Sequence, residues 1–292
     1  MNSLLDRVKH LESEFIKLIH QRFGLVMHVN QASSLVKTIA KSCKKLNYSP
    51  EEYLDQLRYC SSRSFLLTDL ACAITVGESY FFRDKNQMHL LEKIILPQLI
   101  AQNKNSATLK IWSAGCSSGE EIYTLAMLLS ELMPNIETWD LQLLATDINP
   151  NALKKARAGV YTQWSMRSIT DYYIQRYFMV SGSTYMLSPK ICKMVRFNYL
   201  NLSDNSYPSV LNGINDIDLI LCRNVLIYFD DDSVAQIMKR LSSCMAKNAY
   251  LLLGASDPIV TAGTHLVFHH NSAIYFSLDN SSDIKKDFDS DG

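Results

Sequence analysis

The residues best suited to chemistry lie in one stretch, from Lys110 to Glu121. A short apolar run ends there in a small-residue turn that holds Gly115 and Gly119, and apolar residues at helical spacing follow at once. A strand, a glycine turn and a helix in this order bring backbone N–H groups close to a nucleotide-like ligand. The spacing Gly-x-x-x-Gly differs from the G-x-G-x-x-G of dinucleotide-binding folds.

Two carboxylates, Glu120 and Glu121, follow this turn, and no Lys-Ser or Lys-Thr pair does. The stretch is therefore not a phosphate-binding P-loop, because carboxylates beside it would repel a triphosphate. They suit a ligand that carries an ammonium group. The alternative is a tight strand-to-helix turn whose acids only stabilise the helix N-terminus, and the stretch alone leaves both interpretations open.

A cation follows three adjacent aromatic residues at Tyr80-Phe81-Phe82-Arg83, within the segment 76–84. In one interpretation the aromatics pack as a linker on two domains while Arg83 pairs with Asp84. In the other, the segment is a lid whose arginine grips a ligand carboxylate through a bidentate contact.

Further polar residues stand at the ends of apolar runs. Asp147 ends the run 141–146, where an acid at the end of a second strand binds ribose hydroxyls in nucleotide folds. Asn149 is the better candidate for capping the helix that follows. The run 218–222 leads into Arg223-Asn224, and an acidic group at 230–232 then favours helix capping over a metal site.

Composition excludes several classes of protein. Formal net charge is zero over 292 residues, which argues against nucleic-acid binding by bulk electrostatics. The seven cysteines form no C-x-x-C pair, which predicts a reducing compartment and no structural zinc. The N-terminus lacks the apolar core of a signal peptide, and no run approaches the roughly 20 apolar residues of a membrane span. We expect a cytoplasmic protein without metal.

Helical periodicity predicts an all-helical domain over residues 1–75, with helices at 4–22, 31–46, from Ser49, and at 64–75. Residues 76–85 read as a linker or lid, and a helix over 86–102 should kink or break near Pro97. The second helix carries Lys37, Lys41, Lys44 and Lys45 on one face. That face is either solvated or a docking surface for an acidic partner.

Strands and helices alternate from Lys110 on, which predicts an α/β domain over 86–279. Residues 160–200 interrupt the alternation, and we expect an inserted subdomain with a helix and a small antiparallel sheet, its strands near 184–187 and 192–197. Strands near 249–254 and 273–278 should close the domain. The polar tail 280–292 is expected to be disordered.

Four motifs in order resemble the CheR-type chemotaxis-receptor methyltransferases, which are protein-glutamate O-methyltransferases. They are Ser-Tyr-Phe-Phe-Arg (79–83), Trp-Ser-Ala-x-x-Ser-x-Gly-Glu-Glu (112–121), the strand end at Asp147, and Cys-Arg-Asn-Val-x-Ile-Tyr-Phe (222–229). The resemblance covers nearly the whole chain. It implies a class I SAM-dependent methyltransferase fold, with a Rossmann-like sheet, an N-terminal all-helical domain and a small β-insertion. It further implies that S-adenosyl-L-methionine (SAM) methylates glutamate side chains of membrane chemoreceptors.

The resemblance also assigns site residues. It implies that Arg83 holds the methionine carboxylate with Ser79 beside it, and that Glu121 receives the ammonium group next to Gly115. It implies further that Asp147 takes the ribose hydroxyls and that Asn201 and Leu202 lie near the adenine. By the same resemblance, Arg223 and Asn224 complete the pocket, and Tyr228 faces the transferred methyl. A glutamate with a pKa near 4.3 is already a nucleophile at neutral pH, so the reaction needs alignment and no strong base. We therefore expect Arg83, Asn224 and Tyr228 to position and polarise the reacting groups.

Several positions depart from the family pattern. Ser79 stands where the family has Thr, and Gly77 where some members have Asn. Ala255-Ser256-Asp257 replaces His-Ser-Glu, and we expect this to weaken the support of the site without touching the methyl-transfer residues. The loop 181–183 is shorter than in members that bind a receptor-tail pentapeptide, so we expect no such tether. Docking would then rely on the lysine-bearing helix.

Three hypotheses remain open at this point. The chain is either an active enzyme for receptor glutamates, an enzyme of this type for a target outside chemotaxis, or a non-catalytic regulator that binds SAM or its product. The altered segment 255–257 motivates the last of these, while Arg83, Glu121 and Tyr228 speak for an enzyme.

Overall fold

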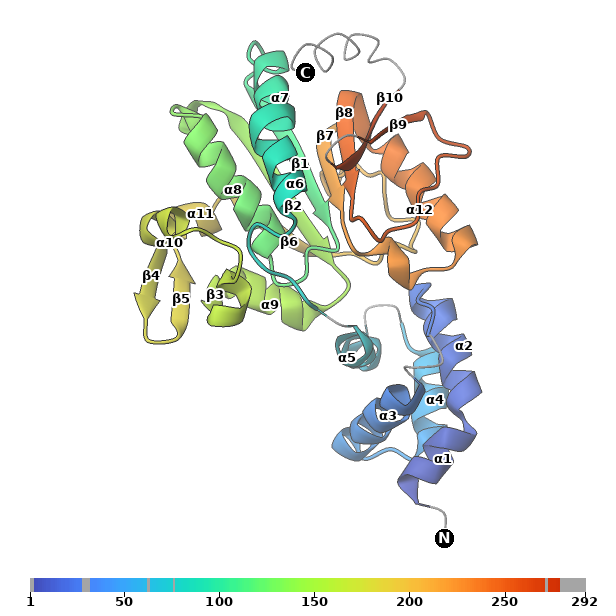
Figure 1. The fold of residues 1–292 in the computed structure, drawn as a ribbon. Helices are drawn as coiled ribbons and strands as arrows, with labels where there is room; N and C mark the ends of the chain where they lie inside the picture. Colours follow the sequence, from blue (N-terminus) through green and yellow to red (C-terminus); the bar gives the residue numbers. More distant parts are fainter. Residues whose placement is uncertain (1–2, 28–31, 62–63, 76, 271–272, 279–292) are drawn as a thin grey trace.

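The structure is a computed structural model, and it describes residues 3–27, 32–61, 64–75, 77–270 and 273–278. The tail 280–292 that was expected to be disordered lies outside these residues. Figure 1 shows a helical group, coloured blue, next to a larger sheet-containing part and a small yellow-green insertion at the side.

The helical group consists of α1 (Leu4–His10), α2 (Glu12–Phe23), α3 (Ala32–Leu46), α4 (Pro50–Tyr59) and α5 (Phe65–Ile74). Their apolar faces form one core, with Phe15, Ile39 and Leu70 fully buried. The single helix expected over 4–22 is wrong, because the backbone leaves helical geometry at Leu11 (φ −94°, ψ 6°) and two helices result. The start of α4 at the Ser49–Glu52 capping box is confirmed.

The segment after residues 77–84 forms α6 (Lys85–Leu90), a π-helical turn (Leu91–Ile95) and α7 (Leu96–Gln102). The break that was one expectation for Pro97 is not found, because Leu91, Ile95 and Leu96 keep right-handed helical dihedral angles, but the helix widens to a π turn there. Proline lacks the N–H of the regular ladder and crowds the carbonyl four residues before it, and the wide π turn lies directly ahead of it.

The large sheet has the strand order β6-β2-β1-β7-β8-β10-β9. Its strands are β1 (Thr108–Ala114), β2 (Asp140–Asp147), β6 (Val195–Tyr199), β7 (Ile217–Cys222), β8 (Met245–Leu253), β9 (Leu266–His270) and β10 (Ile274–Leu278). The five strands from β6 to β8 run parallel, and β10 and β9 pair antiparallel to close the sheet. This is the class I methyltransferase fold.

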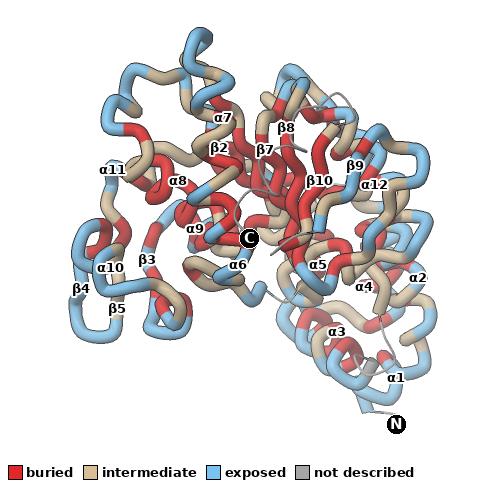
Figure 2. The backbone as a smooth tube through the Cα atoms, turned by 45° about the horizontal axis from the view of Figure 1, so that its top comes forward, coloured by how far each residue is buried: buried red, intermediate tan, exposed pale blue. Residues whose placement is uncertain are grey.

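Two apolar cores cover the two faces of this sheet, and Figure 2 shows its strands as the most deeply buried part. Successive residues of β1 alternate between them, so Ile111 faces α8 (Glu120–Leu132) and α9 (Pro150–Ala158), while Trp112 faces α12 (Asp231–Ser243). The parallel strands therefore read as continuous apolar runs in the sequence.

The insertion contains β3 (Val160–Thr162), α10 (Asp171–Tyr177), β4 (Phe178–Ser181), β5 (Thr184–Leu187) and α11 (Pro189–Cys192), with the sheet order β3-β5-β4. The strand expected near 192–197 does not belong to it. That segment is β6, the edge strand of the large sheet beside β2. Its local pattern identifies a strand but not the partner with which it pairs, and so the assignment was wrong. Strand β9 was not anticipated.

Candidate active site

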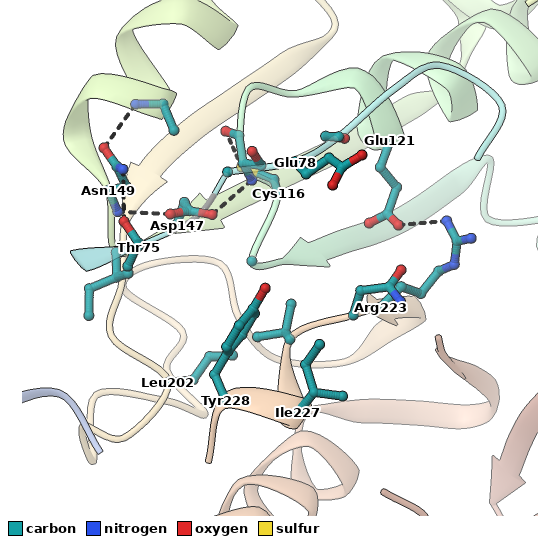
Figure 3. A pocket seen from close by; sticks show the side chains of 18 of the residues that line it. Thr75, Glu78, Cys116, Glu121, Asp147, Asn149, Leu202, Arg223, Ile227 and Tyr228 are labelled. Atoms are coloured by element: carbon teal, nitrogen blue, oxygen red, sulfur yellow. Dashed lines mark hydrogen bonds and ion pairs between the residues drawn. The ribbon is translucent and has the colours of Figure 1, made fainter. Parts of the chain in front are cut away.

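One pocket lies where the parallel strands β1, β2 and β7 end and the helical group approaches the sheet. All ten residues that the sequence predicted for the site line it: Ser79, Arg83, Gly115, Glu121, Asp147, Asn201, Leu202, Arg223, Asn224 and Tyr228. Open parallel sheets bind ligands at this edge, because the loops that follow the strands gather there. Figure 3 shows the pocket from close by.

Residues 77–84, here called the strap, carry Arg83 across this edge. Phe81 is completely buried and its N–H donates to the Ser165 carbonyl of the insertion (3.0 Å). The N–H of Phe82 donates to the Thr124 hydroxyl of α8 (3.2 Å). The aromatics therefore anchor the strap on two neighbouring elements, and the following residue, Arg83, is held at the pocket.

The side chain of Arg83 donates to the Glu78 carbonyl (3.0 Å) and forms no ion pair among the residues that the structure describes. The interpretation in which Arg83 pairs with Asp84 is wrong, because the Asp84 carboxylate instead accepts the Gln87 N–H and caps α6. The guanidinium fork thus keeps donors available for a ligand carboxylate.

The glycine turn after β1 brings the backbone against the loop that follows β7. Gly115 has φ +83°, and its N–H donates to the Thr146 carbonyl (2.8 Å). A Cβ added at Gly115 would lie 2.5 Å from a methyl carbon of Val225. No side chain fits there, so the floor of the pocket between β1 and β7 is backbone.

Asp147 ends β2 at the pocket wall. One of its oxygens accepts the Ser117 N–H and the other accepts the Asn149 N–H, both at 2.8 Å. Burial raises the pKa of Asp147 above its ordinary value, against the opposing effect of these hydrogen bonds. Each oxygen keeps a further lone pair for a ligand hydroxyl. Asn149 caps α9, as expected, by accepting two backbone N–H groups.

Glu121 and Arg223 form an ion pair (2.9 Å) whose arginine side chain is only 2% exposed. The other Glu121 oxygen accepts the Ser113 hydroxyl (2.7 Å), while the guanidinium also donates to the Gln87 side chain and to the Arg83 carbonyl. Figure 3 shows the pair at one end of the pocket. The donors of Arg223 are thus committed to the protein, where they hold Glu121 and the strap in place.

The loop after β7 carries Asn224, whose backbone is left-handed (φ +58°), and Tyr228, which ends a short 3₁₀ turn. Figure 3 shows the Tyr228 side chain pointing into the pocket. The N–H groups of Asn224 (2.5 Å), Val225 (3.0 Å) and Ile227 (3.3 Å) donate to Asp257. The expectation that segment 255–257 does not touch the methyl-transfer residues is therefore wrong, because Asp257 bonds the backbone of Asn224.

The helical group supplies one wall of the pocket. Leu25, Val26 and Met27 line it, and the Val26 N–H donates to the Tyr228 carbonyl (2.8 Å). Asn201 is turned toward the same group, because its side-chain amide donates to the Arg22 carbonyl (3.2 Å). No local pattern in the sequence marked residues 25–27, since they reach the site only through the packing of one domain on the other.

The residues present fit S-adenosylmethionine. The unpaired guanidinium of Arg83 matches its carboxylate, Asp147 matches a ribose diol, and Leu202 and Ile148 offer apolar surface for an adenine. The Ser117 hydroxyl is buried at this pocket and has no hydrogen-bond partner among the described residues, which leaves one more polar group for a ligand.

Among the residues that the structure describes, no three His, Cys, Asp or Glu side chains are grouped in a way that could hold a metal ion. No helix among them is both long enough and apolar enough to cross a membrane.

Comparisons with known proteins agree with this geometry. A family profile described as "CheR methyltransferase, SAM binding domain" matches residues 77–275. The "Chemotaxis protein methyltransferase" of Borreliella burgdorferi is 32% identical over 252 residues, which cover 85% of this chain and 87% of the relative. "Chemotaxis protein methyltransferase 1" of Pseudomonas aeruginosa is 36% identical over 198 residues, 66% of this chain and 70% of the relative.

Among solved structures, magnesium protoporphyrin IX methyltransferase from Synechocystis with bound SAM is 11% identical, covers 82% of this chain and 95% of its own, and has a TM-score of 0.35. The profile match takes in the strap, the sheet and the insertion. The chain therefore belongs to the CheR methyltransferase family and carries that family's SAM binding domain.

Proposed function

We propose that this protein transfers a methyl group from S-adenosylmethionine to glutamate side-chain carboxylates of chemoreceptors. The observation that carries the proposal is the convergence of Arg83, Asp147 and Tyr228 on one pocket in a chain of this family. The printed names of the relatives, chemotaxis protein methyltransferases, support the substrate class.

Each residue receives a role consistent with its contacts. Arg83 binds the methionine carboxylate, with the Ser79 hydroxyl beside it. Glu121, held by Arg223, receives the ammonium group through its remaining lone pairs. Asp147 accepts the ribose hydroxyls. Leu202 and the backbone at Asn201 border the adenine, since the Asn201 side chain is committed to the Arg22 carbonyl.

The chemistry asks little of the protein beyond alignment. The cofactor supplies a methyl group on a positively charged sulfur, and the attacking glutamate is already ionised near pH 7. Holding the two in line converts the reaction into an effectively unimolecular step. Tyr228 and Asn224 line the pocket on one loop, so we assign them to orienting the acceptor carboxylate, with no proton to remove.

The receptor is proposed to dock on α3, whose Lys37, Lys41 and Lys44 are exposed on one face. Lys45 lies beside them but pairs with Asp69 (2.5 Å), so it contributes less free charge. Charge complementarity with an acidic receptor helix supports this surface. The short β4–β5 hairpin at 181–183 supports the view that no receptor-tail pentapeptide is bound.

The test is transfer of tritiated methyl from SAM to receptor-enriched membranes of the host, followed by locating the modified residue. We expect base-labile label on receptor glutamates, and the label should vanish when those glutamates are changed to alanine. Label that persists in the alanine receptors would refute the substrate. Label on another protein would favour a target outside chemotaxis, and product binding without any transfer would favour a regulator.

A further inference from the structure

The loop that presents Asn224 and Tyr228 to the pocket rests on a single buried carboxylate. Asp257 is 5% exposed and lies in the turn after β8, 30 to 33 residues beyond the loop amides that it binds. Its Oδ2 accepts the N–H of Asn224 (2.5 Å) and of Gly254 (2.8 Å). Its Oδ1 accepts the N–H of Val225 (3.0 Å) and of Ile227 (3.3 Å). Both oxygens are thus used twice.

These contacts fix the first part of the loop, whereas its end is held by the Val26 N–H, which donates to the Tyr228 carbonyl (2.8 Å), and by the short 3₁₀ turn. Asn224 is left-handed (φ +58°), a conformation that costs most residues free energy, although asparagine tolerates it. Consecutive N–H groups in such a turn point toward a common acceptor. Without the carboxylate, three N–H groups of this partly buried loop would lose their acceptor, at a cost that a small rearrangement of the loop would relieve.

The end of β8 also confines the loop, next to the Asp257 contact. A Cβ added at Gly254 would lie 2.7 Å from the Asn224 nitrogen and 2.8 Å from its side-chain amide nitrogen. The end of β8 therefore presses directly on Asn224, and Asp257 holds the loop against it. Because Arg223, Asn224, Ile227 and Tyr228 all line the pocket, any shift of this loop moves its wall.

We propose that Asp257 is a positioning residue of the methyltransferase site, which acts through the backbone of Asn224 to Ile227. This inference rests on the proposed function only for its turnover readout. Binding of the product, S-adenosylhomocysteine, requires no acceptor substrate, so failure of the receptor assignment would leave the binding test intact.

Asp257→Asn is the sharpest change, because it keeps the size of the side chain and replaces one acceptor oxygen with an NH₂ group facing two backbone N–H donors. We expect the dissociation constant of S-adenosylhomocysteine, measured by calorimetry, to rise about tenfold. Methyl transfer should fall more, by about a hundredfold in kcat, because misplacement by about 1 Å suffices for such a loss. Asp257→Glu retains the carboxylate and should keep product affinity within about threefold of the wild type.

Asp218→Asn is the matched control. Asp218 lies at the opposite end of β7, where its carboxylate accepts the Lys110 N–H (2.8 Å) and the Asn103 amide (3.2 Å), and it does not line the pocket. Its variant should lower the unfolding temperature and leave both the product affinity and kcat unchanged. Equal losses of affinity in Asp218→Asn and Asp257→Asn would overturn the inference, as would an Asp257→Asn affinity within twofold of the wild type.

Gly254→Ala provides an independent measurement if Asp257→Asn does not fold. Its added methyl group would displace Asn224 by steric contact and would remove no acceptor, and it should also weaken product binding about tenfold. Wild-type product affinity in Gly254→Ala would count against the loop as the route of action.

A double-mutant cycle on kcat tests whether Asp257 and Tyr228 act together. The fold-loss of kcat in the double variant of Asp257→Asn and Tyr228→Phe should be smaller than the product of the two single fold-losses, because both residues act at one wall of the pocket.

Discussion

Arg83 and Asp147 show how the pocket selects its ligand by charge at the scale of single residues. Arg83 has no carboxylate partner among the described residues, while Asp147 and Glu121 bring negative charge to the same space. A ligand with one carboxylate, one ammonium group and a diol complements this set. Each of the two residues yields a measurable expectation.

Arg83→Ala should weaken binding of S-adenosylhomocysteine by about 10- to 100-fold, the worth of a hydrogen bond to a charged group. Arg83→Lys keeps the positive charge but not the forked guanidinium, so its product affinity should lie between those of Arg83→Ala and the wild type. Calorimetry measures both. Arg176→Ala is the control, because Arg176 of the insertion pairs with Glu131 of α8 and does not line the pocket. Wild-type affinity in Arg83→Ala would contradict the proposed carboxylate contact.

Asp147 predicts a pH dependence of binding. Burial raises its pKa, so the folded protein protonates Asp147 at a higher pH than an exposed aspartate, whose pKa is about 3.9. A protonated carboxyl accepts ribose hydroxyls less well. Product affinity should therefore fall as pH is lowered, and the fall should begin above the pH at which exposed aspartates titrate.

The Asp147→Asn variant separates this effect from that of Asp257, whose pKa burial also raises. The variant keeps Asp257, so it should bind more weakly at pH 7 and should lose only the part of the pH dependence that belongs to Asp147. Calorimetric titrations across the acid range on both proteins make the comparison. Identical pH profiles would exclude Asp147 as the titrating group at the ribose.

At the scale of elements, α3 offers a test of receptor docking that is separate from cofactor binding. Lys37→Glu with Lys41→Glu should lower kcat/KM for receptor methylation by about tenfold at low salt, and the loss should shrink as salt rises. The control Lys190→Glu with Lys193→Glu changes the net charge by the same amount, at one residue in α11 and one directly after it, and should have little effect on kcat/KM. Product affinity should stay unchanged in both. Equal loss in the two pairs would argue for net charge instead of a docking face.

The order of the central elements could be predicted because their signals are local. The run before Gly115, the acid at Asp147 and the capping box at Ser49 each fit within a few residues. The strand at 195–199 was placed in the wrong sheet, because the alternation of apolar and polar residues along a strand does not encode the strand with which it pairs. The edge strand β9, which pairs with β10, was missed. The sequence marked segment 255–257 as support for the site, but not the hydrogen bonds of Asp257 to the loop after β7, because these contacts join residues 30 to 33 positions apart.

At the scale of the whole molecule, the helical group acts as part of the pocket. Val26→Pro removes the N–H that bonds the Tyr228 carbonyl, whereas Val26→Ala keeps it and only shortens the side chain. The proline variant should bind S-adenosylhomocysteine about tenfold more weakly, and the alanine variant should stay near the wild type. Equilibrium dialysis of both variants makes the comparison. Equal affinities would mean that this bridge does not shape the pocket.

The isolated β-bridge between Leu25 and Phe229 joins the helical group to the loop after β7, so ligand binding in the pocket is expected to affect how firmly the helical group is attached. Attachment of the helical group adds free energy to the binding of a ligand that touches both walls of the pocket. Because coupling between two equilibria is reciprocal, the bound ligand strengthens that attachment by the same free energy. The loaded protein should then resist proteolysis at the segment joining its two halves better than the empty one. Each round of ligand binding and release would accordingly stiffen and relax the surface that is proposed to dock the receptor.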